Sequence, residues 1–312
     1  MDSGATPTGA AQRLAVVPSE TIKTYLSLQD RTALIELIMD QVDLDDSLQE
    51  RLLFKIAGTG SAKGVDVDAI RALIDTITEE GVAAETVTDG FIERLNNMLV
   101  ALSDLEGDGN AMAVYDLIDY ALSGVERILT TFDHRDGKFD EVLLHLQDLH
   151  LSVCRAARPD PKSLAHRLFE WRLNPVWDVF YDVMATYLDV LSEEGLAEYR
   201  DLAETTWADL PVLKPGDVPP ARFGRRFRLA YIVESIARQS GDHEALAKIR
   251  QKDLFQPASF LAIAETYLQA HKKELAILWA ERGLKEFPDR QDPALNEFLA
   301  SLRESGDMVD DR

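Results

Sequence analysis

Two side chains have the types and spacing to bind a metal ion or to act as a nucleophile. His150 and Cys154 are four positions apart, which places an imidazole and a thiol on one face of a helix. Such a pair can begin a zinc site, and an imidazole can activate a thiolate. His166 is the only distant candidate for a third ligand. The pattern therefore favours a half-buried histidine and an inert core cysteine over a zinc or thiol site.

A short acidic stretch resembles the first half of an EF-hand calcium loop. Asp104, Glu106 and Asp108 offer oxygen ligands at positions 1, 3 and 5, and Gly109 follows at position 6. Position 12 needs a bidentate glutamate, but the sequence has Tyr115 there. We therefore expect a solvated turn between two helices, with no bound metal and no cofactor.

The chain has no glycine-rich phosphate loop, no His-Glu-x-x-His and no Gly-x-Ser-x-Gly motif. The sequence thus predicts a protein that is not an enzyme. The alternative is a metal-dependent or hydrolytic enzyme that uses the acidic stretch at 104–108 and the His150/Cys154 pair.

Composition limits the partners of the chain. A formal net charge of −22 over 312 residues repels phosphate backbones and anionic lipid, so we expect neither direct nucleic-acid binding nor membrane binding. Residues 1–18 have no basic start and no sustained apolar stretch, which predicts a disordered tail rather than a secretory signal. The single cysteine excludes an internal disulfide. The expected location is the cytoplasm.

The elements that would position these side chains are helices throughout. Prolines separate segments whose apolar residues recur every three or four positions, as in amphipathic helices. The sequence predicts an all-α fold of stacked helical hairpins, an α-solenoid. The expected helices lie near residues 19–42, 45–57, 66–80, 88–106, 110–132, 138–157, 161–173, 176–191, 193–209, 225–239, 242–252, 257–270, 272–286 and 292–304.

One proline-rich stretch divides the chain. Residues 211–224 carry several prolines and glycines, which predicts a linker or a strap. An acidic helical domain at 19–210 would precede it, and a helical hairpin array at 225–312 would follow.

The segment from Phe260 to Asp289 resembles a tetratricopeptide repeat. Large residues mark its first helix, and small Ala276, Ala280 and Gly283 mark its second, where the helices would nest. A weaker copy, residues 236–249, precedes it by 29 or 30 positions. The sequence therefore predicts a tetratricopeptide-like array that is capped by the last helix.

A basic segment within this array suggests an interaction face. Residues 222–252 hold eight basic and three acidic side chains, in contrast to the rest of the chain. A protein or peptide partner, which could be acidic, would bind the first helices of the repeats. The alternative is that the arginines dock onto the acidic domain. The predicted partner-binding residues are Arg228, Tyr231, Ser235, Arg238, Leu261, Glu265 and Gln269.

Most of the chain also resembles a known group of proteins. Residues 146–171, 177–204 and 280–290 are similar to uncharacterised bacterial helical proteins, in many of which this region follows a SWIM-type zinc finger. That finger needs Cys-x-Cys followed by Cys-x-His, which a chain with one cysteine cannot form. The resemblance implies a helical-repeat module that acts beside a separate finger-bearing or nucleic-acid-associated partner, and it carries over no catalytic residues.

Overall fold

The protein is all-helical in its computed structural model, which describes residues 19–59, 65–84, 86–105, 110–131, 137–174, 176, 182–218, 224–288 and 292–307. Within these ranges there are fifteen helices and no β-strand. The expected all-α class is confirmed. The helices are α1 (Ser19–Ser27), α2 (Arg31–Val42), α3 (Asp46–Thr59), α4 (Val67–Ala83), α5 (Asp89–Ser103), α6 (Ala111–Thr131), α7 (Asp140–Ala157), α8 (Pro161–Leu173), α9 (Val183–Thr186), α10 (Leu188–Asp209), α11 (Arg225–Gln239), α12 (His243–Arg250), α13 (Pro257–Gln269), α14 (Lys273–Glu286) and α15 (Pro293–Asp307).

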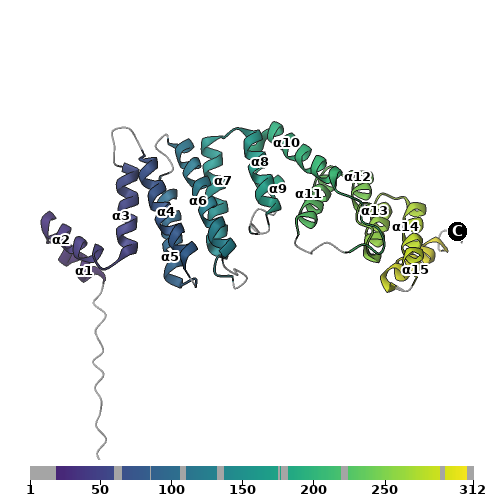
Figure 1. The fold of residues 1–312 in the computed structure, drawn as a ribbon, viewed down its shortest axis with the longest axis horizontal. Helices are drawn as coiled ribbons and strands as arrows, with labels where there is room; N and C mark the ends of the chain where they lie inside the picture. Colours follow the sequence, from purple (N-terminus) through teal and green to yellow (C-terminus); the bar gives the residue numbers. More distant parts are fainter. Residues whose placement is uncertain are drawn as a thin grey trace, which may run out of the picture.

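The helices follow one another in an extended row (Figure 1). The principal packing partners are close in sequence: α4 with α6, α6 with α7, α8 with α10, and α13 with α14. The first helices lie at one end of the row and α15 lies at the other (Figure 1). Because contacts join near neighbours, each end of the row presents a helix surface beyond which the described residues form no further helix.

Two expected helix starts have the geometry that their sequence indicates. The Asp160 carboxylate accepts a hydrogen bond from the Ser163 amide at 2.8 Å, directly before Pro161. Asp292 likewise accepts from the Leu295 amide at 3.2 Å, directly before Pro293. In both cases an aspartate cap precedes a proline that needs no backbone donor.

Two expected helices are divided. The segment at 19–42 breaks into α1 and α2, because the Asp30 carboxylate accepts from the Ala33 amide at 2.9 Å and starts a new helix. The segment at 176–191 contains only the short α9 and the start of α10, and residues 177–181 lie outside the described ranges. The expected boundary at residue 192 coincides with a kink inside α10, where Ser192 has φ 56°.

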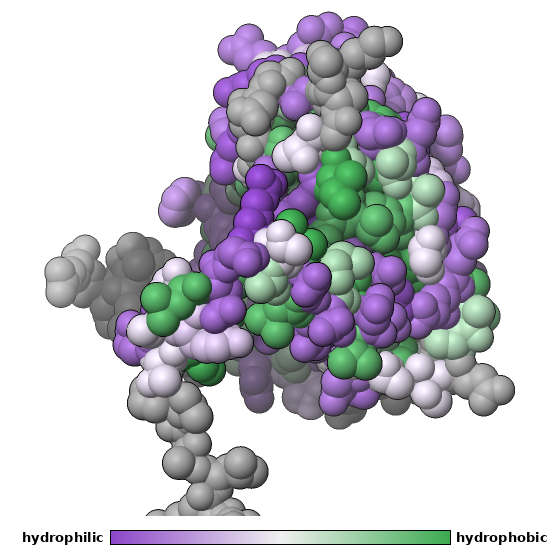
Figure 2. All heavy atoms as spheres, turned by 90° about the vertical axis from the view of Figure 1, so that its left-hand side faces the viewer, coloured by the Kyte–Doolittle hydropathy of each residue, from purple (hydrophilic) through white to green (hydrophobic). Residues whose placement is uncertain are grey.

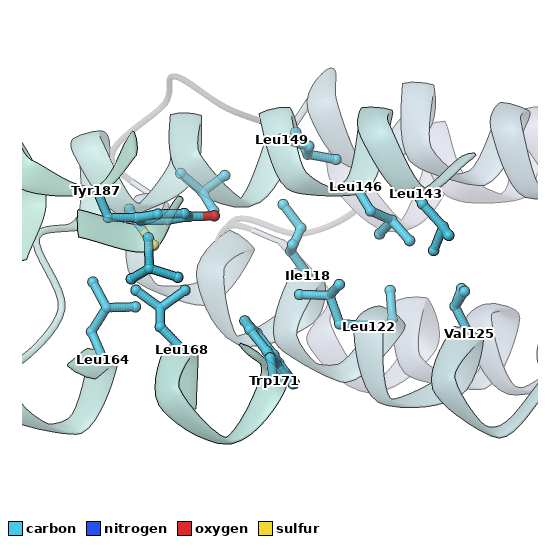
Figure 3. Close-up of a cluster of buried hydrophobic side chains, with 14 of the residues drawn as sticks. Ile118, Leu122, Val125, Leu143, Leu146, Leu149, Leu164, Leu168, Trp171 and Tyr187 are labelled. Carbon is cyan, nitrogen blue, oxygen red and sulfur yellow. The ribbon is translucent and has the colours of Figure 1, made fainter. Parts of the chain in front are cut away.

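The largest hydrophobic cluster extends through most of the row. It begins at Phe54 on α3 and continues to Ile236 on α11. Figure 3 shows its centre, where leucines of α7 and α8 face residues of α6 such as Ile118, with Trp171 and Tyr187 beside them. Two smaller clusters lie among α12–α15 and the residues next to them. The large core thus continues beyond the proline-rich stretch and includes α11.

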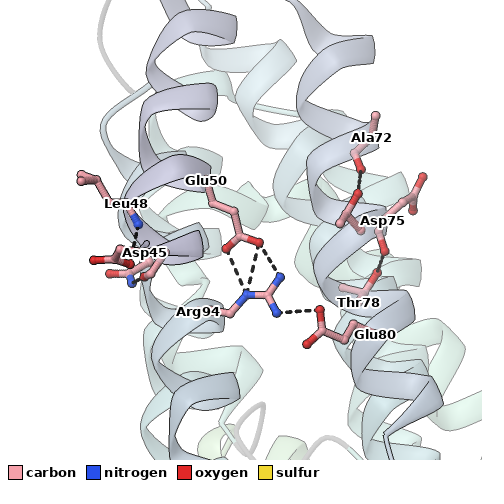
Figure 4. Close-up of polar contacts among 11 residues, drawn as sticks. Asp45, Leu48, Glu50, Ala72, Asp75, Thr78, Glu80 and Arg94 are labelled. Atoms are coloured by element: carbon pink, nitrogen blue, oxygen red, sulfur yellow. Dashed lines mark hydrogen bonds and ion pairs between the residues drawn. The ribbon is translucent and has the colours of Figure 1, made fainter. Parts of the chain in front are cut away.

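A charged group joins three N-terminal helices. Arg94 on α5 lies between Glu50 on α3 and Glu80 on α4 (Figure 4). Its Nε donates to both Glu50 oxygens at 3.2 Å, and its Nη1 donates to Glu80 at 2.6 Å. The hydrogen bond to Glu50 raises the pKa of Arg94. Three helices are therefore connected through one guanidinium.

Candidate interaction surface

The His150/Cys154 pair is buried in the core. Both side chains are 0 % exposed, and the Cys154 sulfur lies 3.6 Å from Nε2 of His150. Nδ1 of His150 lies 2.9 Å from the Tyr187 hydroxyl, and Trp171 packs edge-on against the imidazole ring. Burial raises the pKa of the Cys154 thiol to about 12 and lowers the pKa of His150 to about 3. At neutral pH the pair is thus a neutral thiol and a neutral imidazole, which cannot perform nucleophilic chemistry.

Burial of Cys154 predicts its reactivity. We expect a thiol reagent such as Ellman's reagent to modify native protein only as fast as the protein opens, because the thiol is inaccessible and un-ionised. Reaction in denaturant should be complete within the mixing time. Cys154 is the only cysteine, so the signal has no other source. Rapid modification of fully folded protein would contradict this burial.

Burial of His150 predicts a pH dependence of stability. The ordinary pKa of 6.5 applies to the unfolded chain, and the folded value is about 3, so the unfolded state binds more protons between these limits. The contribution of His150 is fully present above pH 6.5 and is lost as the pH falls toward 3. In this window we expect the free energy of unfolding to fall by up to about 1.4 kcal/mol per pH unit.

Urea unfolding of the wild type and of His150→Phe from pH 7 to pH 4 measures this effect. The phenyl ring does not titrate, so the variant should have the shallower slope even if removal of the Tyr187 contact lowers its stability at pH 7. Equal slopes would show that folded His150 binds a proton at the same pH as the unfolded chain, which would contradict the lowered pKa.

The acidic stretch does not form a ligand group among the described residues. Asp104 follows α5 and is exposed, and residues 106–109 lie outside the described ranges. Tyr115, at the place of the missing glutamate, is part of α6 and contacts the His150 ring. Within the part of the chain that the structure describes, no three His, Cys, Asp or Glu side chains gather as metal ligands would.

Three of the predicted partner-binding residues line one hollow. The hollow has a volume of about 260 Å³, and its lining includes Arg238 on α11 and Glu265 and Gln269 on α13. His243 and Arg250, which we did not include in the predicted face, complete its polar lining. The hollow thus lies between two successive pairs of helices.

The other four predicted residues lie elsewhere. Arg228 is only 4 % exposed, so it does not belong to an exposed partner-binding face as predicted. Tyr231 is exposed, but its ring stacks against the Arg172 guanidinium at 5.2 Å. Ser235 and Leu261 are half-buried, and Leu261 packs against the cluster around Ala264.

Both arginines of the hollow share one internal carboxylate partner. Arg238 and Arg250 each form an ion pair with Glu234 on α11. Arg250 also donates to the Ala262 carbonyl at 2.7 Å and to the Thr266 hydroxyl at 2.8 Å, both on α13. Glu265 is exposed across the hollow. The hollow is therefore polar and of mixed charge rather than basic.

Other basic side chains of the segment hold the C-terminal helices to α8, α10 and the proline-rich stretch. Arg226 binds Asp253 and donates to the Pro211 carbonyl at 2.9 Å. Lys252 donates to three backbone carbonyls around the end of α10. A parallel β-bridge between Leu213 and Asp253 lies beside these contacts. These contacts favour the alternative in which the basic residues dock internally.

A second hollow shares Ala237 with the first. It measures about 390 Å³ and lies between α10, α11 and α12, with Trp207, Val233 and Ile236 on its apolar side. Lys248 and Glu204 are charged residues of its lining.

The turns of the two C-terminal hairpins have the same geometry. Gly241 and His271, 30 positions apart, both have positive φ, 69° and 58°. The amide after each donates to a carbonyl five residues back: Asp242 to Ala237 at 3.1 Å, and Lys272 to Tyr267 at 2.9 Å. This is the hydrogen bond of a Schellman motif, and it ends α11 and α13 alike. Ala276, Ala280 and Gly283 are buried, as the repeat pattern predicts.

These observations define an all-helical protein whose successive helices pack on their neighbours, with polar and apolar hollows among α10–α13. Residues 27–301 match a family of unknown function, DUF6880, and the chain belongs to that family. No curated protein and no solved structure matches the chain. In the described residues no helix has the length and apolar character that crossing a bilayer requires. The relation to finger-bearing proteins stays a prediction.

Proposed function

We propose that the protein is a non-enzymatic interaction scaffold that binds a polypeptide segment across α11–α13. The observation that carries this proposal is the meeting of Arg238, Glu265 and Gln269 in one hollow, from helices that are separate in the sequence. Polar side chains at the rim would hydrogen-bond the partner, and the neighbouring hollow beside Trp207 would take an apolar side chain.

The proposal includes a repeat arrangement of the C-terminal helices. We infer that α11–α12 and α13–α14 are two copies of a tetratricopeptide-like hairpin, that α15 caps them, and that the whole row is an α-solenoid. The matching turns at Gly241 and His271 support this inference. The spacing of 30 residues is shorter than the tetratricopeptide period of about 34. The first helix of each copy, α11 or α13, would then contribute to the partner surface.

The charges at the hollow favour a polar partner of mixed charge over an acidic partner. Glu234 pairs with two arginines, and Glu265 adds a second negative charge at the hollow. The enzyme alternative has little support, because His150 and Cys154 are buried and un-ionised at neutral pH.

Affinity capture from native lysate tests the proposal with matched variants. Gln269→Trp places a large ring in the hollow, whereas Lys285→Trp places the same ring on an exposed part of α14. Partners of the unaltered protein should be lost by the first variant and retained by the second, with both melting as the parent does. If the two variants capture the same proteins as the unaltered chain, the hollow is not the binding site.

A further inference from the structure

The exposed apolar residues of the described chain are concentrated at its N-terminal end. About half of the exposed large hydrophobic side chains lie between Ile22 and Ile56, in α1–α3 and their connections. Helix α1 has no buried residue, and Val42 is the only buried residue of α2. Figure 2 views the molecule from this end and shows hydrophobic residues exposed among hydrophilic ones. Scattered single residues need no explanation, but a cluster of this kind marks an interaction site.

The most regular part of this cluster is a stripe on α2. Ile35, Ile38 and Met39 have the i, i+3, i+4 spacing that places them on one helix face, and they are 51 %, 48 % and 50 % exposed. Leu53 and Ile56 on α3 are also exposed, and they line a hollow of about 400 Å³ between α3 and α4. Both α2 and α3 therefore present apolar side chains that a partner could cover.

The charge beside the stripe indicates what that partner is. Glu36 lies three positions before Met39, so the two are neighbours on the helix surface, and Asp40 lies four positions after Glu36 on the same side; both are exposed. Arg31, four positions before Ile35, is an exposed cation near the other end of the stripe. Asp43 follows directly after the helix and is also exposed. In all, residues 19–59 hold eight acidic and four basic side chains, so the surface is acidic on balance. Such a surface is complementary to a helix that has an apolar face bordered by lysine or arginine.

The same charge argues against the other occupants. A second copy of the chain would bring the same net charge of −22 to the contact, and this charge opposes self-association. Amphipathic helices that bind bilayers carry basic polar faces, whereas this surface is acidic on balance. From the exposed apolar side chains and the acidic balance of charge around them we propose that α1–α3 form a docking surface for a basic amphipathic helix of another protein. This surface is separate from the hollow at α11–α13, so either proposal can fail alone.

A fluorescent model peptide with leucine and lysine at amphipathic helical spacing tests the docking surface on the full chain. The peptide should bind in fluorescence anisotropy, and Ile35→Gln/Met39→Gln should weaken binding at least about tenfold. The matched control is Leu144→Gln/Leu278→Gln, which changes two equally exposed leucines elsewhere and should bind as the unaltered chain does. Circular dichroism must show both double variants folded.

Three results would overturn the proposal. One is equal binding of the leucine–lysine peptide to both double variants, which would mean that net charge alone attracts it. Another is equally tight binding of a leucine–glutamate peptide of the same pattern. The third is a dimer in sedimentation that Ile35→Gln/Met39→Gln dissociates, which would assign the surface to a second copy of the chain.

Discussion

Replacing Arg94 by methionine should lower the free energy of unfolding by about 3 kcal/mol. The Arg94 and Glu50 side chains are only 17 % and 13 % exposed, so the substitution leaves the Glu50 carboxylate largely buried without its cation. Removing one partner of a buried ion pair costs about 3–5 kcal/mol, and the partial exposure places this pair near the lower limit. The second carboxylate, Glu80, is more than half exposed and adds little.

Urea unfolding of Arg94→Met measures this loss, with Arg127→Met as the control. Arg127 is 57 % exposed and lies 4.0 Å from Asp75, so its replacement should change stability by less than about 1 kcal/mol. The double variant Arg94→Met/Glu50→Gln should regain part of the loss, because it removes the isolated charge. A change below about 0.5 kcal/mol for Arg94→Met would contradict the proposed connection of α3, α4 and α5.

Replacing Lys252 by methionine should also cost about 3 kcal/mol. Its Nζ donates to the carbonyls of Trp207, Ala208 and Leu210 at 2.6, 2.8 and 2.8 Å. Carbonyls at a helix C-terminus lack intrahelical donors, and a cation there also interacts favourably with the helix dipole. Hydrogen bonds from a charged donor contribute about 1.5–3 kcal/mol, and the three share one ammonium, so the loss is less than additive.

The exposed Lys248, one turn earlier, provides the matched control. Lys248→Met should leave the melting temperature nearly unchanged, whereas Lys252→Met should lower it by several degrees. Hydrogen exchange should locate the damage: the amides of Leu213 and Leu254, which donate to the Lys252 and Leu213 carbonyls at the β-bridge, should lose protection first. A uniform loss of protection across all helices would contradict a local role of Lys252.

Helical periodicity and local capping predicted much of the fold. The caps at Asp160 and Asp292 depend on neighbouring residues alone, and the structure has both. The sequence also predicted a repeat with a spacing of 29 or 30 positions, and this repeat stays a prediction; the turns at Gly241 and His271 are 30 positions apart. Within one helix, the pattern says which residues share a face.

Periodicity did not show which neighbours cover each face. Arg228, Tyr231, Ser235 and Arg238 share a face of α11, but Arg228 is buried. Helix α11 packs against α8, α10 and α12. Such contacts join residues far apart in the sequence, and a single helix pattern does not contain them. The exposed stripe of α2 was missed for the same reason, because an apolar stripe ordinarily predicts burial.

Photo-crosslinking in native lysate tests the scaffold proposal most directly. A photoreactive residue at position 269 lies in the hollow at α11–α13, and one at position 285 lies on the exposed part of α14. The proposal predicts a discrete crosslinked partner from position 269 that is absent from position 285, with the crosslinked peptide mapping to a single segment of that partner. The same pattern from both positions, or none from 269, would contradict a binding site in the hollow.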